Sequence, residues 1–323
     1  MTPLPFALLD GKWLTDAIDA FSAGYPAGSF LGLSPNIKAL LALVFVSLCC
    51  GAVGSLVVGG RMAFFSDALA HCAFAGVSIG FLVFSLVAPP GQKNDAAFWR
   101  WVTPIMIAFG ALIGCGIAYV RGQTGLSSDT VIGVFFAVAI GLAAAIQKQV
   151  KNRRLFSMEE FLFGNPVYVD GGDLIGLFFL VLLTAVVLMW VYNPLLLSSF
   201  NQSLALSRRL PVRTANYVFV VLLAVVVNLC LRAVGVLLIN ALLVVPAATA
   251  FNLSRNMRQL FWRTVLLCLG ISIAGQLLSW EVRARTGMDL GISGTIVLLS
   301  VGLFFLSMLY AWWQRAAAER KRA

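Results

Sequence analysis

The stretch from Phe64 to Phe84, FFSDALAHCAFAGVSIGFLVF, has the length and apolar content of a membrane-spanning helix. At 1.5 Å per residue, about 20 apolar residues cross the hydrocarbon core of a bilayer. Two residues do not fit a purely structural role there, because Asp67 and His71, the single histidine of the chain, lie four positions apart within it. Ionisable groups are costly inside a membrane, so this pair needs a functional explanation.

The composition of the whole chain agrees with a membrane protein. Of the 323 residues, 60% are hydrophobic and 11% are charged, against about 25% charged residues in a typical soluble domain. The net charge of +10 comes from Lys and Arg that cluster between apolar runs, as in KQVKNRR and SRRLPVR. This pattern is typical of loops that flank membrane spans. No nucleic-acid recognition module is present, so we expect no nucleic-acid partner.

Apolar segments of spanning length predict an all-α, polytopic bundle with eight or nine spans. The nine candidate segments are 37–59, 65–88, 99–120, 130–147, 174–192, 215–231, 234–251, 262–280 and 290–312. Segment 130–147 is short. Segment 234–251 carries Pro246 in its interior, and proline removes a backbone donor and clashes with the preceding turn. We therefore expect 234–251 to be a broken helix at the core of the bundle or a re-entrant element.

The chain divides into three regions by composition. Residues 1–36 form an N-terminal extension, 37–313 a single membrane domain, and 314–323 a basic tail. If 193–214 faces the cytoplasm, alternation of nine spans places the N-terminus outside and the tail inside. The distribution of basic residues is nearly balanced and does not decide the orientation.

Part of the N-terminal extension, GKWLTDAIDAFSAGYP, has the pattern of a short amphipathic helix that lies in the membrane interface. We expect Trp13, Ile18 and Phe21 to face lipid. Asp16 and Asp19 would face water.

Spacing places Asp67 and His71 on one helix face, with Cβ atoms about 5–6 Å apart. A carboxylate oxygen and an imidazole nitrogen suit zinc, manganese or iron. Two ligands would hold such an ion only transiently, as a conduit requires. Alternatively, Ser66 or Asp67 caps the helix and His71 is merely hydrogen-bonded within the bundle. The many small residues that follow favour close helix packing, so we expect the pair to point into protein rather than lipid.

Five segments together resemble the ABC-3 family, the membrane permease subunits of zinc, manganese and iron ABC importers. The first is SDALAHCAFAGVSIG (66–80), which is similar to the family's GDALSHAVLPGVALG. The others are GSLVVGGRMAFF (54–65), LSSDTVIGVFFAVAIGLA (126–143), EEFLFGNPVYVDGGDL (159–174) and VGVLLINALLVVPAATA (234–250). They occur in the family's order.

The resemblance implies a permease that imports a divalent transition metal, with Asp67 and His71 in the metal pathway. It also implies that 201–213 contains a cytoplasmic coupling helix that docks on an ATPase. The residues concerned are Ala205, Leu206, Ser207, Arg208 and Arg209. By the same resemblance, the broken element around Pro246 belongs to the translocation core.

The implied partners are cytoplasmic ABC ATPase subunits, an extracytoplasmic metal-binding receptor, and a second permease copy or a related permease. The chain has no G-x-x-x-x-G-K-[ST] phosphate loop, so ATP hydrolysis is expected on a separate chain and no resident cofactor on this one. The expected location is the inner, or plasma, membrane of a bacterium.

Two rivals to an ABC permease make different demands on the sequence. An ion-coupled secondary transporter would use Asp67 and His71 as a proton or ion relay. An intramembrane metalloprotease would need an H-E-x-x-H helix, which a chain with one histidine does not contain.

Overall fold

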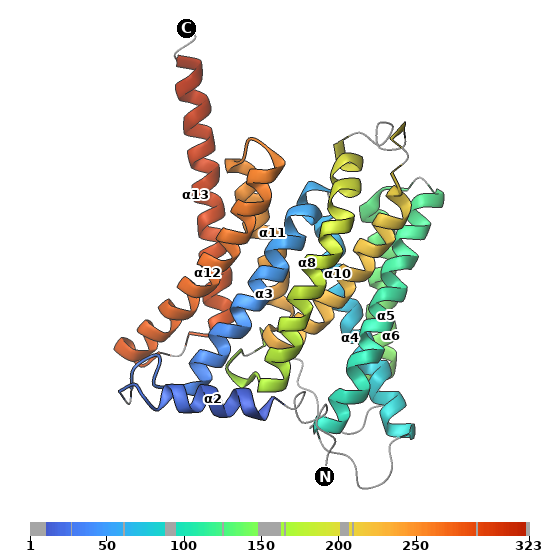
Figure 1. The fold of residues 1–323 in the computed structure, drawn as a ribbon. Helices are drawn as coiled ribbons and strands as arrows, with labels where there is room; N and C mark the ends of the chain where they lie inside the picture. Colours follow the sequence, from blue (N-terminus) through green and yellow to red (C-terminus); the bar gives the residue numbers. More distant parts are fainter. Residues whose placement is uncertain are drawn as a thin grey trace. The chain divides into compact units, whose positions relative to one another are not determined.

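A computed structural model provides the fold of the chain (Figure 1). It describes residues 11–26, 28–60, 62–87, 95–124, 126–147, 163–164, 166–200, 207–208, 210–288 and 290–320. Within these ranges the helices are joined by turns and irregular segments, and no strand occurs. The elements are α2 (Lys12–Ser22), α3 (Ser34–Gly59), α4 (Ala63–Val87), α5 (Asp95–Thr124), α6 (Ser128–Gln147), the 3-10 turn η2 (Pro166–Tyr168), α8 (Gly171–Phe200), α10 (Val212–Val234), α11 (Val236–Leu253), α12 (Met257–Thr286) and α13 (Ile292–Arg320).

The helical bundle predicted from hydropathy is confirmed. In the described part of the chain, nine helices are long and apolar enough to cross a membrane. They coincide with the nine predicted segments, including the short segment 130–147, which lies in α6, and the proline-containing segment 234–251, which forms α11.

The chain folds into two compact units. One unit comprises Met1–Val58, Phe163–Leu183 and Ala233–Ala323, and the other comprises Gly59–Leu162 and Thr184–Arg232. We call these the outer-segment unit and the α4 unit, respectively. The first contains α2, α3, α11, α12, α13 and the beginning of α8, and the second contains α4, α5, α6, the rest of α8 and most of α10.

Helix α3 packs tightly within the outer-segment unit. A Cβ atom at Gly54 would lie 2.4 Å from the carbonyl oxygen of Leu243 in α11, so only glycine permits this approach. Ser47 of α3 donates a hydrogen bond of 2.7 Å to Ser272 of α12. Small residues and interhelical hydroxyl bonds are the usual way in which membrane helices associate.

Two glycines form a close backbone crossing in the same unit. Gly235 separates α10 from α11 with φ of 83°, and Gly164 has φ of 56°. A Cβ at Gly164 would lie 2.3 Å from the carbonyl carbon of Val234. The segment before η2 therefore passes directly over the turn between α10 and α11, and positive φ and the lack of a side chain are both needed there.

The break predicted at Pro246 is not found, because α11 is one continuous helix from Val236 to Leu253. Pro246 cannot donate to the carbonyl of Leu242, four residues earlier. That carbonyl instead accepts a hydrogen bond from the thiol of Cys268 in α12, with Sγ and O 3.3 Å apart. The helical structure is instead interrupted at Gly235, where α10 ends and α11 begins.

The predicted helix in the N-terminal extension is present as α2, but one of its faces was assigned wrongly. Trp13 and Phe21 are exposed, as are Asp16 and Asp19. Ile18, however, is buried at 7% exposure. Its apolar side chain packs on protein rather than facing lipid.

Candidate functional site

Helix α4 carries the candidate site and packs against α5 and α6 within its unit. The contact with α5 depends on small residues. A Cβ at Gly76 would lie 2.9 Å from the Cα of Met106, and one at Gly80 would lie 3.1 Å from the side chain of Val102. Close approach of the two helices brings dispersion contacts that substitute for the hydrophobic drive in lipid.

Asp67 and His71 approach each other on one face of α4. The His71 Nε2 and Asp67 Oδ1 atoms are 3.7 Å apart, which is longer than a hydrogen bond but within ion-pair distance if the imidazole is protonated. The Asp67 side chain remains 46% exposed and the His71 side chain 32% exposed. The i, i+4 geometry predicted from the sequence is therefore present in the fold.

The pair lies on an accessible stripe along the first half of α4. Phe64, Asp67, His71 and Phe74 follow one another along this face and are exposed or half-buried. The described side chains between them, from Phe65 to Ala73, are buried. We call the four residues the open stripe of α4. The expectation that the pair points into protein is met only in part, since this chain alone leaves the stripe accessible.

An aromatic ring fixes one side of the imidazole. Phe136 of α6 meets His71 edge to face, with ring centroids 4.9 Å apart and planes at 80°. This T-shaped contact restrains the imidazole while Nε2 remains directed toward Asp67. Sequence reasoning missed Phe136, because one phenylalanine in an apolar span has no distinguishing pattern.

The chemistry available at the pair is that of a weak, two-ligand site. Among the described residues, no three His, Cys, Asp or Glu side chains are grouped closely enough to hold a metal ion. A carboxylate and an imidazole can bind a divalent ion briefly, whereas tight sites use four protein ligands.

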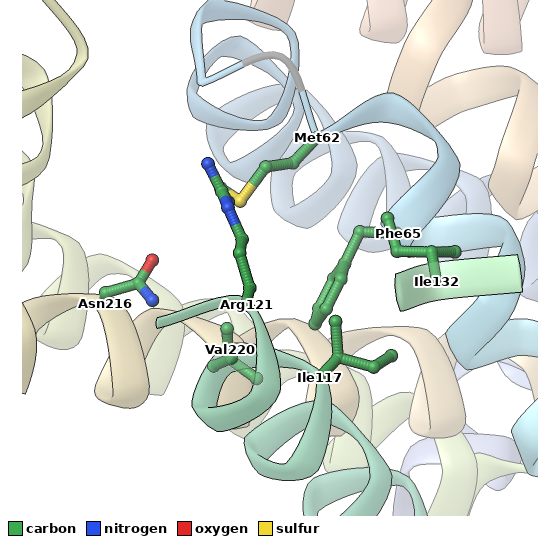
Figure 2. Close-up of a pocket in the computed structure, with 8 residues that line it drawn as sticks. Met62, Phe65, Ile117, Arg121, Ile132, Asn216 and Val220 are labelled. Atoms are coloured by element: carbon green, nitrogen blue, oxygen red, sulfur yellow. The ribbon is translucent and has the colours of Figure 1, made fainter. Parts of the chain in front are cut away.

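A small pocket occurs elsewhere in the α4 unit, where α5 ends and α6 and α10 begin (Figure 2). It is lined by Met62, Phe65, Ile117, Ala118, Arg121, Ile132, Asn216 and Val220. Asp67 and His71 do not line it. The Arg121 guanidinium repels a dication, and the remaining lining offers few oxygen or nitrogen ligands, so this pocket is not a candidate metal site.

The other predicted site residues occupy different positions. Ser207 and Arg208 are exposed in a short turn before α10. Ala205, Leu206 and Arg209 lie outside the described residues. Pro246 is buried in α11, in the other unit.

The family of the chain follows from comparison with known proteins. The sequence profile of the ABC 3 transport family matches residues 35–311, which cover the nine candidate spans except for Ser34 at the start of the first and the last three residues of the ninth. The chain belongs to the ABC 3 transport family. The resemblance inferred from the five ordered motifs is thereby confirmed.

Relatives within the ABC 3 transport family are named as metal transport proteins. The manganese import system permease protein ScaB of Streptococcus gordonii is 28% identical over 284 residues, which cover 86% of this chain and 92% of the relative. The high-affinity zinc uptake system membrane protein ZnuB of Buchnera aphidicola is 27% identical over 269 residues, which cover 83% of this chain and 95% of the relative.

The fold is also that of a solved structure. The structure of PsaBC from Streptococcus pneumoniae in complex with Fab matches 86% of this chain and 92% of its own chain, with a TM-score of 0.68. The sequence identity is 24%, so this match supports the fold alone.

Proposed function

We propose that the chain is the membrane permease subunit of an ABC importer for a divalent transition metal. Manganese and zinc are favoured over iron as the metal it transports. The observation that carries the proposal is the Asp67–His71 pair on the open stripe of a span in a chain of the ABC 3 transport family. The named relatives import manganese or take up zinc, which supports both the direction and the class of cargo.

The open stripe of α4 supports assembly with a second permease copy. A carboxylate and an imidazole exposed to acyl chains would be costly. A second copy of this chain, or a related permease, would cover the stripe and enclose a path along it. The pair would then face a water-filled path between the two copies, where its charges are solvated.

In this mechanism the metal ion is the cargo and is never held tightly. A receptor outside the membrane delivers the ion, and Asp67 and His71 replace part of its hydration shell as it passes. Because only two side chains bind it, the ion is released readily. Phe136 keeps the imidazole in position through its edge-to-face contact.

Energy for transport would come from ATPase subunits on the cytoplasmic side. Ser207 and Arg208 are exposed just before α10 begins, as a docking segment for another protein must be. Movement of this segment would pass to α10, which follows it directly. The corresponding location of the chain is the plasma membrane of a bacterium, with nine spans.

Reconstitution tests the class of transporter. The permease is placed in liposomes with and without its ATPase, the metal-binding receptor is added outside, and uptake of radioactive manganese or zinc is measured with ATP inside or outside the vesicles. We expect uptake only with the ATPase present and ATP on its side of the membrane. Uptake driven by a proton gradient without the ATPase would instead support the ion-coupled secondary transporter.

A further inference from the structure

Helix α2 precedes the part of the chain that the family profile matches, and its side chains divide into three faces. Ile18 and Ser22 are buried on one face. Lys12, Asp16 and Asp19 are exposed on a second, polar face. Trp13, Ala17, Ala20 and Phe21 are exposed on a third face, which is apolar. A helix on the surface of a protein in water needs only an apolar face that packs on the protein and a polar face that meets water. The additional exposed apolar face of α2 therefore requires a partner.

Contacts with two spans fix α2 at the level where the spans begin. Ser34, the first residue of α3, donates a hydrogen bond to Asp19, and the Lys38 ammonium lies 3.5 Å from the same carboxylate. At the start of α2, a Cβ at Gly11 would lie 2.2 Å from the backbone of Gly171, the first residue of α8. Figure 1 shows α2 lying across the ends of these two helices.

This level is the boundary between the hydrocarbon core and water. Lys38 is four residues into α3, about 6 Å along its axis, and the span must begin near the membrane surface. An amphipathic helix in the interface buries its apolar face about 5–10 Å deep. The position of α2 relative to the first turn of α3 is therefore the depth at which interfacial helices lie.

The residues of the exposed apolar face are those that lipid interfaces favour. Trp13 is 52% exposed and Phe21 54% exposed, and Tyr25, just after the helix, is exposed as well. Tryptophan and tyrosine gather at the headgroup level because their rings are apolar and their N–H and O–H groups stay hydrated.

We propose that α2 is a lipid anchor that lies flat in the interface of the same bilayer, with Trp13, Ala17, Ala20 and Phe21 inserted between headgroups. Its buried face binds the outer-segment unit, its polar face meets water, and its apolar face meets lipid. Through Asp19 and Gly11 the anchor holds the first turns of α3 and α8 at one depth. This proposal depends on the spans but not on the metal cargo.

Cysteine variants at neighbouring positions of α2 test which face meets lipid and which meets water. Ala17→Cys and Asp16→Cys are each labelled with a small environment-sensitive fluorophore in the full-length chain. Five of the six native cysteines are buried and Cys115 is half-buried, so the labelled parent protein gives the background. The proteins are placed in nanodiscs of phosphatidylethanolamine and phosphatidylglycerol, with or without lipid that carries a nitroxide high on its acyl chain.

We expect the label at position 17 to emit at shorter wavelength and to be quenched severalfold more by the nitroxide lipid than the label at position 16. A third label, at Ala20→Cys, should behave as at position 17. Equal, water-like emission at positions 16, 17 and 20 would overturn the proposal. So would an apolar signal at position 17 that arises only when a second protein is added, since the face would then bind protein.

Discussion

Pro246 leaves the carbonyl of Leu242 without its helical donor, and the thiol of Cys268 supplies one from the neighbouring helix. Cys268 is fully buried, and water cannot replace it. A helix in lipid must satisfy its backbone internally. A single thiol therefore explains why α11 continues through its proline.

A double-mutant cycle tests this role of Cys268. Cys268→Ala should lower the free energy of unfolding by about 1 kcal/mol, because the Leu242 carbonyl loses its donor. On a Pro246→Ala background the alanine N–H can bond that carbonyl, so the same substitution should cost less. Unfolding in mixed detergent micelles gives both values. Identical costs on the two backgrounds would show that the thiol does not compensate for the proline.

Gly235 is the second residue whose identity the backbone dictates. Gly235→Ala should destabilise the fold by about 1–3 kcal/mol, the cost of placing an L-residue at φ 83° and ψ 163°, where essentially only glycine occurs, with the overlap against Gly164 added. Gly270→Ala is the matched control, since its Cβ would meet open space in α12 and alanine favours helix. Thermal unfolding in detergent measures both. Equal unfolding midpoints for the two variants would show that the backbone does not require glycine at position 235.

At the scale of elements, the closeness of α4 and α5 decides where the candidate site lies. Gly76 allows α4 to approach the backbone of Met106, and Asp67 and His71 lie on the open stripe of the same helix, where Phe136 of α6 contacts the imidazole. A change at this contact should therefore displace the site without touching it.

Gly76→Ala should push the two helices apart and cost about 1–3 kcal/mol of stability, as overpacking does. Gly141→Ala, in α6, has open space around its Cβ and serves as control. Metal uptake, normalised to folded protein, should fall in the first variant only. Unchanged stability of Gly76→Ala would mean that the contact with Met106 can relax without cost.

The contact of Asp19 in α2 with Ser34 and Lys38 in α3 should depend on pH. The hydroxyl of Ser34 lowers the pKa of Asp19, and the nearby Lys38 ammonium lowers it further. A carboxyl whose pKa is lower in the folded state contributes stability above its unfolded pKa, about 3.9. That contribution is lost as the pH falls through the lower, folded value.

Asp19→Asn should therefore reduce the thermal midpoint near neutral pH, and the difference from the parent should shrink as the pH falls below the unfolded pKa of about 3.9 and through the lower, folded pKa. Asp16→Asn, on the same polar face, is the control. A difference that persists at the lowest pH, or that Asp16→Asn shares, would show that the charge of Asp19 does not hold the helix.

At the scale of the whole molecule, hydropathy and length were sufficient to locate the nine apolar segments and to predict eight or nine spans, because lipid permits few alternatives to the helix. The i, i+4 spacing was sufficient to bring Asp67 and His71 together. The burial of Ile18 could not be predicted, since the faces of α2 that meet lipid and protein are both apolar. The continuity of α11 depends on a donor 26 residues beyond Leu242, and local sequence does not contain it.

The role of the pair in the whole transporter is the central claim, and it follows from the open stripe of α4. Ser78 offers a matched control on the same helix, because its hydroxyl donates a hydrogen bond to the carbonyl of Phe74. Removing that hydroxyl changes the polarity of α4 without changing the candidate ligands.

The most direct test is the initial rate of ATP-driven manganese or zinc uptake into proteoliposomes, compared among the parent, Asp67→Asn, His71→Gln and Ser78→Ala. A lost charged or imidazole ligand is worth about 1.5–3 kcal/mol, which is roughly ten- to hundredfold. We predict a loss of that size in the Asp67 and His71 variants, with the Ser78 variant close to the parent. Full uptake by correctly folded Asp67→Asn and His71→Gln proteins would contradict the account.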